Sequence, residues 1–126
     1  MRILLVEPPK TTWELMGCNC ISPPLGLAQL AAVLKAEGIT VDIVDCNASE
    51  TDWAGLNEYI SESQPDIVGA TALKPFFYQA LRTIEIAKKV NPEIITILGG
   101  PHVTFTVEET LCSSTVAIFP APWSLP

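Results

Sequence analysis

The stretch Ile94-Ile-Thr-Ile-Leu-Gly-Gly-Pro-His102 (IITILGGPH) joins an apolar, largely β-branched run to two glycines and the chain's only histidine. The run does not alternate between polar and apolar positions, which is typical of a strand buried on both faces of a parallel sheet. Two glycines directly after such a strand form a tight turn or let a ligand approach the backbone. The stretch therefore predicts an α/β fold with a loop of interest at a strand end.

Three further runs have the same character, and each is separated from the next by a segment with helical spacing. The runs are 3–6, 41–44 and 66–70, and a possible fifth strand covers 115–119. Apolar residues at i, i+3, i+4 and i+7 predict the helices between them. The three stripes are Leu27, Leu30, Ala31 and Leu34; Trp53, Leu56 and Ile60; and Phe77, Ala80, Leu81, Ile84 and Ala87. Gly38 is placed to end the first helix.

The resulting order of alternating strands and helices predicts an open, doubly wound parallel sheet with helices on both faces. We expect the flavodoxin-like (Rossmann-like) strand order 2-1-3-4-5, in which ligands bind at the carboxyl ends of the strands. Residues 1–119 form the single predicted domain, with a short helical piece at 107–112. The tail 120–126 contains three prolines and cannot form the helix that normally covers the last strand, so we expect an incomplete C-terminal end.

Composition restricts the classes of partner. With 48% apolar residues in 126, the chain can fill a core, and its net charge of −7 comes without any basic cluster. Nucleic acids and anionic membranes both need local positive charge, so we expect neither as a partner. Gln29 and Lys35 interrupt the best apolar stretch, so we expect no membrane span.

The four cysteines form no paired CxxC units and no regular disulfide framework. They stand at Cys18, Cys20, Cys46 and Cys112, which favours a reducing cytoplasm as the location. The CxC at 18 and 20 is too sparse for a zinc or iron–sulfur site without further ligands. The other two cysteines are most simply small buried apolar residues.

The candidate functional residues follow the four predicted strands at one edge of the sheet. The segments are Glu7-Pro8-Pro9, Asp45-Cys46-Asn47, Thr71-Ala72-Leu73 and Gly99-Gly100-Pro101-His102. The loop after the first strand, 7–22, is long for this architecture, and such loops are usually functional. We therefore expect the ligand at this edge.

Two interpretations stay open for each of these residues. Gly99 and Gly100 either form a tight turn only or admit a ligand to the backbone. Asp45 either accepts a hydrogen bond from a ligand hydroxyl or caps the turn that follows it. His102 either contacts a ligand or holds its own loop, and it has no partners that would make it a catalytic base or a metal site. No phosphate-binding GxGxxG or GxxxxGK[ST] is present.

Four blocks in this order resemble a known family. They are SPPLGLAQLAAVLKAEG, VDIVDCNA, PDIVGATAL and LGGPHVTFTVEETL, within residues 1–112. Together they are similar to the N-terminal cobalamin (vitamin B12)-binding domain of radical SAM enzymes, the group that includes anaerobic magnesium-protoporphyrin monomethyl ester cyclases and B12-dependent methylases. The resemblance is specific for the family and not for a substrate.

The resemblance implies where the cofactor would lie. The corrin ring would rest on the carboxyl ends of the strands, beside the block Pro23-Pro24-Leu25-Gly26, and Pro8 would belong to the same edge. The nucleotide tail would pass along Thr71, Ala72 and Leu73 and the paired glycines 99–100. Pro101 and His102 fall at the positions that follow those glycines in the family.

The sequence also departs from B12 domains that carry Asp-x-His-x-x-Gly after the first strand. The loop here reads EPPKTTW (7–13) and has no histidine. By resemblance to the radical SAM group, cobalamin would bind base-off with no protein histidine on cobalt. The CxxxCxxC motif of the catalytic half is absent from this chain, so the iron–sulfur cluster and SAM of the family would belong to a separate catalytic domain.

Three functions are compatible with the sequence. The first is a cobalamin-binding module, not catalytic alone, that presents its cofactor to a radical SAM domain for methyl transfer or related radical chemistry. The second is a cofactor-free flavodoxin-like regulatory or interaction domain, with a homodimer among its possible assemblies. The third is a flavin-binding electron carrier on the same fold.

Overall fold

The computed structural model describes residues 1–9, 24–72, 77–100 and 117–119. Five parallel strands form one sheet in the order β2-β1-β3-β4-β5, which confirms the predicted strand order 2-1-3-4-5. The strands are β1 (Arg2–Glu7), β2 (Thr40–Asp45), β3 (Ile67–Thr71), β4 (Ile95–Gly99) and β5 (Ala117–Phe119). Strand β5 covers 117–119 of the predicted strand 115–119; residues 115–116 and the predicted helical piece at 107–112 lie outside the described residues.

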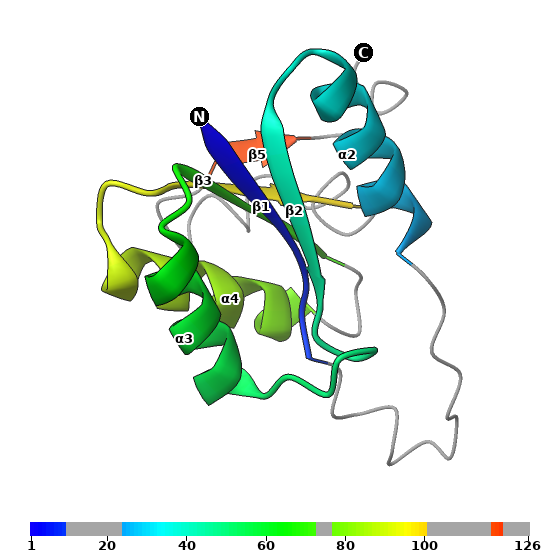
Figure 1. Cartoon of the computed structure of the whole chain (residues 1–126). Coiled ribbons are helices and arrows are strands. Elements are labelled where there is room, and N and C mark those ends of the chain that lie inside the picture. The colour runs from blue at the N-terminus through cyan, green and yellow to red at the C-terminus, as the bar shows by residue number, and fades with distance from the viewer. Residues whose placement is uncertain (10–23, 73–76, 101–116, 120–126) are drawn as a thin grey trace, which may run out of the picture.

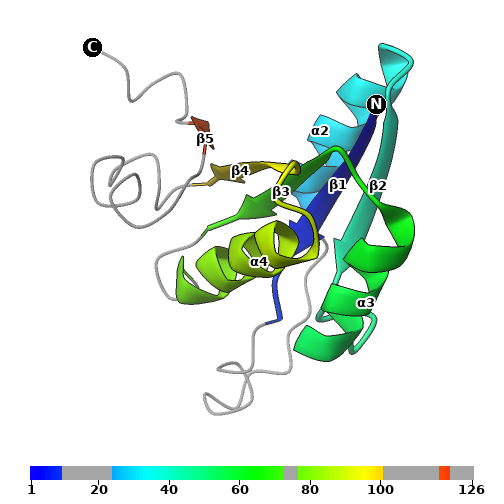
Figure 2. The same cartoon turned by 90° about the vertical axis from the view of Figure 1, so that its left-hand side faces the viewer.

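Three helices cover the sheet from both sides. Helix α2 (Leu25–Ala36) lies on one face, and α3 (Trp53–Ser63) and α4 (Phe77–Val90) lie on the other. Figure 2 shows this separation, with α2 behind the sheet and the other two helices in front of it. Right-handed crossovers require this arrangement, because the chain moves one way along the sheet from β1 to β2 and the other way from β2 to β4. None of the described helices is long and apolar enough to cross a membrane.

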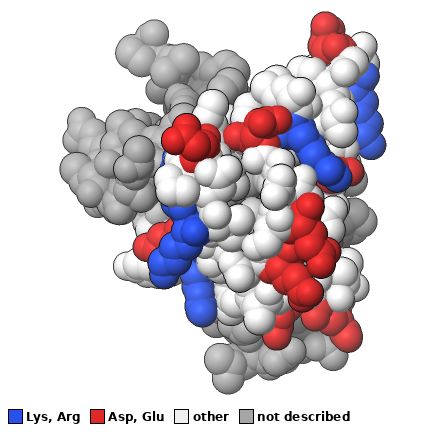
Figure 3. Space-filling model, turned by 60° about the vertical axis from the view of Figure 1, so that its left-hand side comes forward, with Lys and Arg blue, Asp and Glu red and all other residues white. Residues whose placement is uncertain are grey.

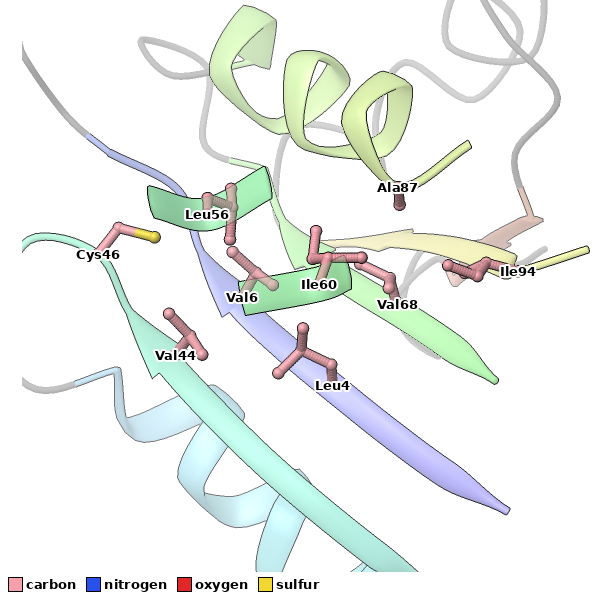
Figure 4. Close-up of a cluster of buried hydrophobic side chains, with 9 residues drawn as sticks. All are labelled: Leu4, Val6, Val44, Cys46, Leu56, Ile60, Val68, Ala87 and Ile94. Atoms are coloured by element: carbon pink, nitrogen blue, oxygen red, sulfur yellow. The ribbon is translucent and has the colours of Figure 1, made fainter. Parts of the chain in front are cut away.

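The core beneath α3 and α4 is built from one set of alternate strand residues (Figure 4). Leu4, Val6, Val44 and Val68 project from the strands toward Leu56 and Ile60, with other members of the cluster around them. The opposite set, which includes Ile3, Leu5 and Val41, packs under α2. Since successive side chains of a strand point to opposite faces, the unalternated runs supply both layers at once.

Local signals set the ends of two helices. Gly38 has a φ of 79°, and the N–H of Ile39 donates to the carbonyl of Leu34, which ends α2 as a left-handed glycine ends many helices. Asp52 begins α3 by accepting a hydrogen bond at Oδ1 from the N–H of Gly55 at 2.7 Å.

One residue of the stripes that predicted the helices is exposed. Leu27 and Ala31 of α2 are buried, but Leu30 is 55% exposed. Leu30 is about 60° around the helix from Leu27, because each residue advances the helix by about 100°. It consequently lies on the flank of α2, where the described chain places no covering helix.

Candidate functional site

The predicted site residues meet at the carboxyl edge of the sheet, which we call the rim. Strand pairing sets Glu7 beside Asp45 and Thr71 beside Gly99. Three hydrogen bonds tie the loops together there: Cys46 N–H to the Glu7 carbonyl at 3.2 Å, Asn47 Nδ2 to the Pro8 carbonyl at 3.1 Å, and Ala72 N–H to the Gly99 carbonyl at 2.7 Å. The rim is therefore held as two pairs of loops, those after β1 and β2 and those after β3 and β4.

Three of the rim residues share one face of the sheet. Val68 and Ala70 pack toward α3 and α4, so the alternating residue Thr71 belongs to the face that α2 covers. The same alternation puts Asp45 and Gly99 on that face. The candidate site therefore lies on the α2 side of the sheet.

Helix α2 begins at this same rim, since helices in such folds run antiparallel to the strands. Pro24 precedes its first turn and is half-buried, and Leu25 is 70% exposed. Gly26 lies about 100° around the helix from Leu27, and the right-handed crossover directs that flank toward β3 and β4. Gly26 and Gly99 thus lie at the same end of the sheet, on the side of α2 that faces β3 and β4.

The two consecutive glycines have different roles. A Cβ atom at Gly99 would meet no atom of the described residues within 4 Å. A Cβ at Gly100 would lie 2.7 Å from the Ala72 carbonyl oxygen, and its φ of 107° is unfavourable for residues with side chains. Gly100 is therefore required by the packing of its own loop, whereas the bare position at Gly99 leaves open space on the α2 side.

Gly26 resembles Gly99 in this respect, because no atom of the described residues lies within 4 Å of a Cβ built there. Glycine in a helix costs about 0.5–1 kcal/mol relative to alanine, and no close contact with the described part of the chain requires it at this position. The two open glycines leave room at the rim for a bulky ligand to reach the backbone of both α2 and β4. The residues present therefore fit a large, flat cofactor such as the corrinoid that the sequence predicts.

Asp45 has a structural partner. Its Oδ1 accepts hydrogen bonds from the N–H groups of Asn47 at 3.0 Å and Ala48 at 3.2 Å. This pattern is that of a side chain that caps its own turn. The structure favours the capping interpretation, and a ligand contact by Asp45 stays a prediction.

Two further groups at the rim, Glu7 and Cys46, belong to the predicted strand-end segments but were given no role in binding the cofactor. Glu7 ends β1 with only 7% of its surface exposed. The sequence feature that could have pointed to it is an acidic residue at the end of an apolar strand. Cys46 is buried, as predicted. Burial, followed by the nearby charges of Asp45 and Glu7, raises the pKa of its thiol from 9.0 to about 12. Cys46 is consequently a neutral thiol at physiological pH and not a thiolate nucleophile.

Several predicted residues lie outside the described part of the chain: Leu73, Pro101, His102, Cys18, Cys20 and Cys112. Their assignments stay predictions. Within the described ranges, no group of three or more His, Cys, Asp or Glu side chains is arranged to hold a metal ion.

A surface hollow lies at the opposite end of the sheet from the rim, between the C-terminal ends of α3 and α4. It has a volume of about 520 Å³, and its polar lining includes Asn57, Gln64, Lys89 and Asn91. None of the predicted site residues contributes to it, and the rim has the feature that a bulky cofactor needs, which is open backbone. We therefore place the candidate site at the rim.

Comparison with known sequences shows the family of the chain. The family model described as "B12 binding domain" matches residues 20–120. An uncharacterized methyltransferase of Pyrococcus horikoshii is 40% identical over 111 residues, covering 88% of this chain and 24% of the relative. An anaerobic magnesium-protoporphyrin IX monomethyl ester cyclase of Rubrivivax gelatinosus is 40% identical over 126 residues, covering 98% of this chain and 21% of the relative.

Solved structures share the fold. The radical S-adenosylmethionine methyltransferase TsrM of Kitasatospora setae superposes with a TM-score of 0.66 at 24% identity, over 82% of this chain and 20% of TsrM. The cobalamin-dependent S-adenosylmethionine radical enzyme OxsB, with aqua-cobalamin bound, gives 0.68 at 20% identity, over 87% of this chain and 15% of OxsB. The chain spans about a fifth to a quarter of the length of these sequence relatives. Because the family model covers most of its length, this chain belongs to the B12-binding domain family.

Proposed function

We propose that this chain binds cobalamin at its rim and presents the cofactor to a radical SAM catalytic domain, without being catalytic alone. The corrin ring rests on the carboxyl ends of β1, β3 and β4, and the nucleotide tail passes between α2 and the β3–β4 surface. The observation that carries this proposal is the open space at Gly99, beside a Gly100 that the loop itself needs. Membership of the family and the cobalamin-bound neighbour support the choice of ligand.

Each rim residue has an assigned part in holding the cofactor. Thr71 supplies a hydroxyl beside Gly99, suited to hydrogen-bonding a polar group of the tail. Pro8, Pro24 and Leu25 provide apolar surface at the rim, and Ala72 keeps the loop after β3 in place through its bond to Gly99. Leu73, Pro101 and His102 are proposed contacts that continue these loops. Cobalt, when bound, supplies the chemistry of accepting and donating a methyl group.

The lower face of cobalt is proposed to have no protein ligand. The segment 7–13 after β1 contains no histidine, and Cys46 is held as a neutral thiol by its raised pKa, so neither group is suited to coordinate there. Cobalamin would therefore bind base-off, with its own benzimidazole between α2 and the sheet. The partner that completes the reaction is a catalytic domain of the kind the larger relatives carry.

The binding experiment uses the chain mixed with hydroxocobalamin and passed through gel filtration. We expect retained corrin absorbance with the wild-type chain and at least a tenfold weaker affinity in Gly99→Val, because the new side chain fills the open space. The matched control is Ala54→Val, which adds similar bulk at an exposed position of α3. Absence of retained cobalamin by the folded wild-type chain would contradict the proposal.

A second measurement tests the lower ligand. The reduced, cob(II)alamin form of the complex is expected to give an electron paramagnetic resonance spectrum without nitrogen superhyperfine splitting. Clear splitting from one nitrogen would show a base or histidine bound to cobalt and would overturn the base-off proposal alone.

A further inference from the structure

The segment that follows β1 contains two prolines in succession, Pro8 and Pro9, directly after the last strand residue, Glu7. Proline has no backbone N–H, so neither of them can donate a hydrogen bond to the neighbouring strand β2. The backbone of these two residues can be joined to the segment after β2 only where their carbonyl oxygens accept a hydrogen bond. The donor must then come from the other segment.

The carboxamide of Asn47 supplies such a donor. At the end of the β1–β2 pairing, the N–H of Cys46 donates to the carbonyl oxygen of Glu7 at 3.2 Å. One residue further along both segments, Nδ2 of Asn47 donates to the carbonyl oxygen of Pro8 at 3.1 Å, in a part-buried position. A side chain thus extends the connection between the two segments past the end of the sheet.

Asn47 is itself held in place by the turn after β2. Oδ1 of Asp45 accepts hydrogen bonds from the N–H groups of Asn47 at 3.0 Å and Ala48 at 3.2 Å. The carbonyl oxygen of Asp45 accepts two more, from the N–H of Ser49 at 3.1 Å and from its hydroxyl at 2.8 Å. Because the turn is fixed by these bonds, the short side chain of Asn47 has a defined direction toward Pro8.

The connected segment lies where the proposed cofactor surface begins. Strand β1 pairs with β3 in the sheet. From β1 the chain crosses to β2 through α2 on one face, and from β3 it crosses to β4 through α4 on the other. The carboxyl ends of β1 and β3 therefore flank the point where the connections diverge, at which ligands of doubly wound folds bind. The direction in which the chain leaves β1 decides whether that point is open.

We propose that Asn47 is a positioning residue of the cofactor site. Its carboxamide, oriented by Asp45, holds Pro8 against the segment after β2 and thereby keeps the carboxyl ends of β1 and β3 accessible to cobalamin. Asn47 acts through Pro8 and needs no contact of its own with the cofactor. This inference rests on the proposed function, since it assigns a further residue to the same site. It also gives the turn-capping Asp45 a part in the site, as the residue that orients Asn47.

The first test measures the affinity of each folded chain for hydroxocobalamin by titration of the corrin absorbance, with circular dichroism as the check of folding. Asn47→Ala removes the donor and is expected to weaken binding at least fivefold at pH 8. Asn47→Asp keeps the shape of the side chain, but an ionised carboxylate has no proton to donate. Its binding is expected to weaken at least as much at this pH. Wild-type affinity in Asn47→Ala overturns the proposal.

Lowering the pH restores the donor in Asn47→Asp alone, because a protonated carboxyl group donates one hydrogen bond. The carboxylates of Asp45 and Glu7 lie close to this position, and the thiol of Cys46 stays neutral, so like charge raises the pKa of the introduced carboxyl. From pH 8 to pH 5, the affinity of Asn47→Asp relative to wild type is expected to recover at least threefold. That of Asn47→Ala is expected to stay constant. Parallel profiles for the two variants would indicate a general packing role and overturn the proposal.

The matched control makes the same two substitutions on α3. Asn57 is exposed, and its helix already carries Glu58 and Glu62. Figure 3 shows acidic side chains gathered on a face of the molecule that is turned forward with α3 and α4. One more carboxylate there is a small change, so Asn57→Ala and Asn57→Asp are expected to bind cobalamin as wild type does. Losses equal to those of the Asn47 variants would overturn the assigned role of Asn47.

A measurement without cofactor separates this inference from the proposed function. Lys10 follows Pro8 by two positions, and the rate of trypsin cleavage after it can be followed by mass spectrometry. The rate is expected to rise at least threefold in Asn47→Ala and to stay at the wild-type value in Asn57→Ala. An unchanged rate in Asn47→Ala overturns the inference even where cobalamin is retained. If the wild-type chain retains no cobalamin, the proposed function fails and the role of Asn47 in that site fails with it, whereas cleavage after Lys10 still decides whether Asn47 holds the segment.

Discussion

The amide N–H of Ala72 donates to the carbonyl oxygen of Gly99 across 2.7 Å. This bond joins the loops after β3 and β4 beyond the last residues of the sheet pairing, and it brings the Ala72 backbone against Gly100. The neighbouring glycine, Gly99, is left facing open space. This one hydrogen bond thus fixes the loop after β4, in which Gly99 presents only backbone at the candidate cofactor surface.

The first prediction concerns the packing at Gly100. Gly100→Ala forces a Cβ to 2.7 Å from the Ala72 carbonyl oxygen at a φ of 107°, so we expect the free energy of unfolding to fall by about 1–3 kcal/mol. Urea denaturation measures the change. The control is Gly26→Ala, where no described residue lies within 4 Å of the new Cβ and helix propensity is expected to raise stability by up to about 1 kcal/mol. Equal effects of the two substitutions would contradict this account of the loop.

The second prediction concerns the buried thiol of Cys46. Its pKa is raised from 9.0 to about 12, so the folded state holds the proton more tightly than the unfolded state does. The contribution of the protonated thiol to the free energy of unfolding is fully present below pH 9 and is lost as the pH rises from about 9 toward 12. Between pH 8 and 10, the free energy of unfolding of the wild-type chain is expected to fall by about 1 kcal/mol more than that of Cys46→Ala. The comparison isolates Cys46, because both proteins contain all the other titrating groups.

Denaturation at the two pH values measures that difference, and parallel pH profiles for the two proteins would show that folding does not raise the pKa of Cys46. Alkylation gives an independent check. Iodoacetamide at pH 8 is expected to modify the peptide containing Cys46 slowly in the native chain and rapidly in urea, since the thiolate is the reactive form.

The third prediction concerns the start of α3. Asp52→Ala removes the acceptor of the Gly55 N–H bond and is expected to lower the free energy of unfolding by about 1 kcal/mol. Asp52→Asn retains an oxygen acceptor and is expected to cost less than half as much. If thermal unfolding showed the same loss for both variants, the effect would come from charge or from the loop and not from the cap.

Much of the candidate site could be predicted from strand ends. Parallel strands bring their carboxyl ends to one edge, so the residues after four unalternated runs had to lie together, as Asp45, Thr71 and Gly99 do. The different roles of Gly99 and Gly100 could not be predicted, because they depend on the Ala72 backbone, 28 positions away from Gly100 in sequence. The partners of Asp45 were predicted only as one of two alternatives, since a capping aspartate and a ligand-binding aspartate have the same sequence context.

The sequence by itself determined the strands, the helices and their order, because hydrophobic periodicity and turn residues act over a few positions of the chain. Only the tertiary structure decided which apolar residues are covered. Leu27 and Leu30 belong to the same helical stripe, yet one is buried and the other is 55% exposed. The reason is geometric. Spacing along the chain fixes the angle between two side chains around the helix, whereas burial depends on which distant elements pack against each side of that helix.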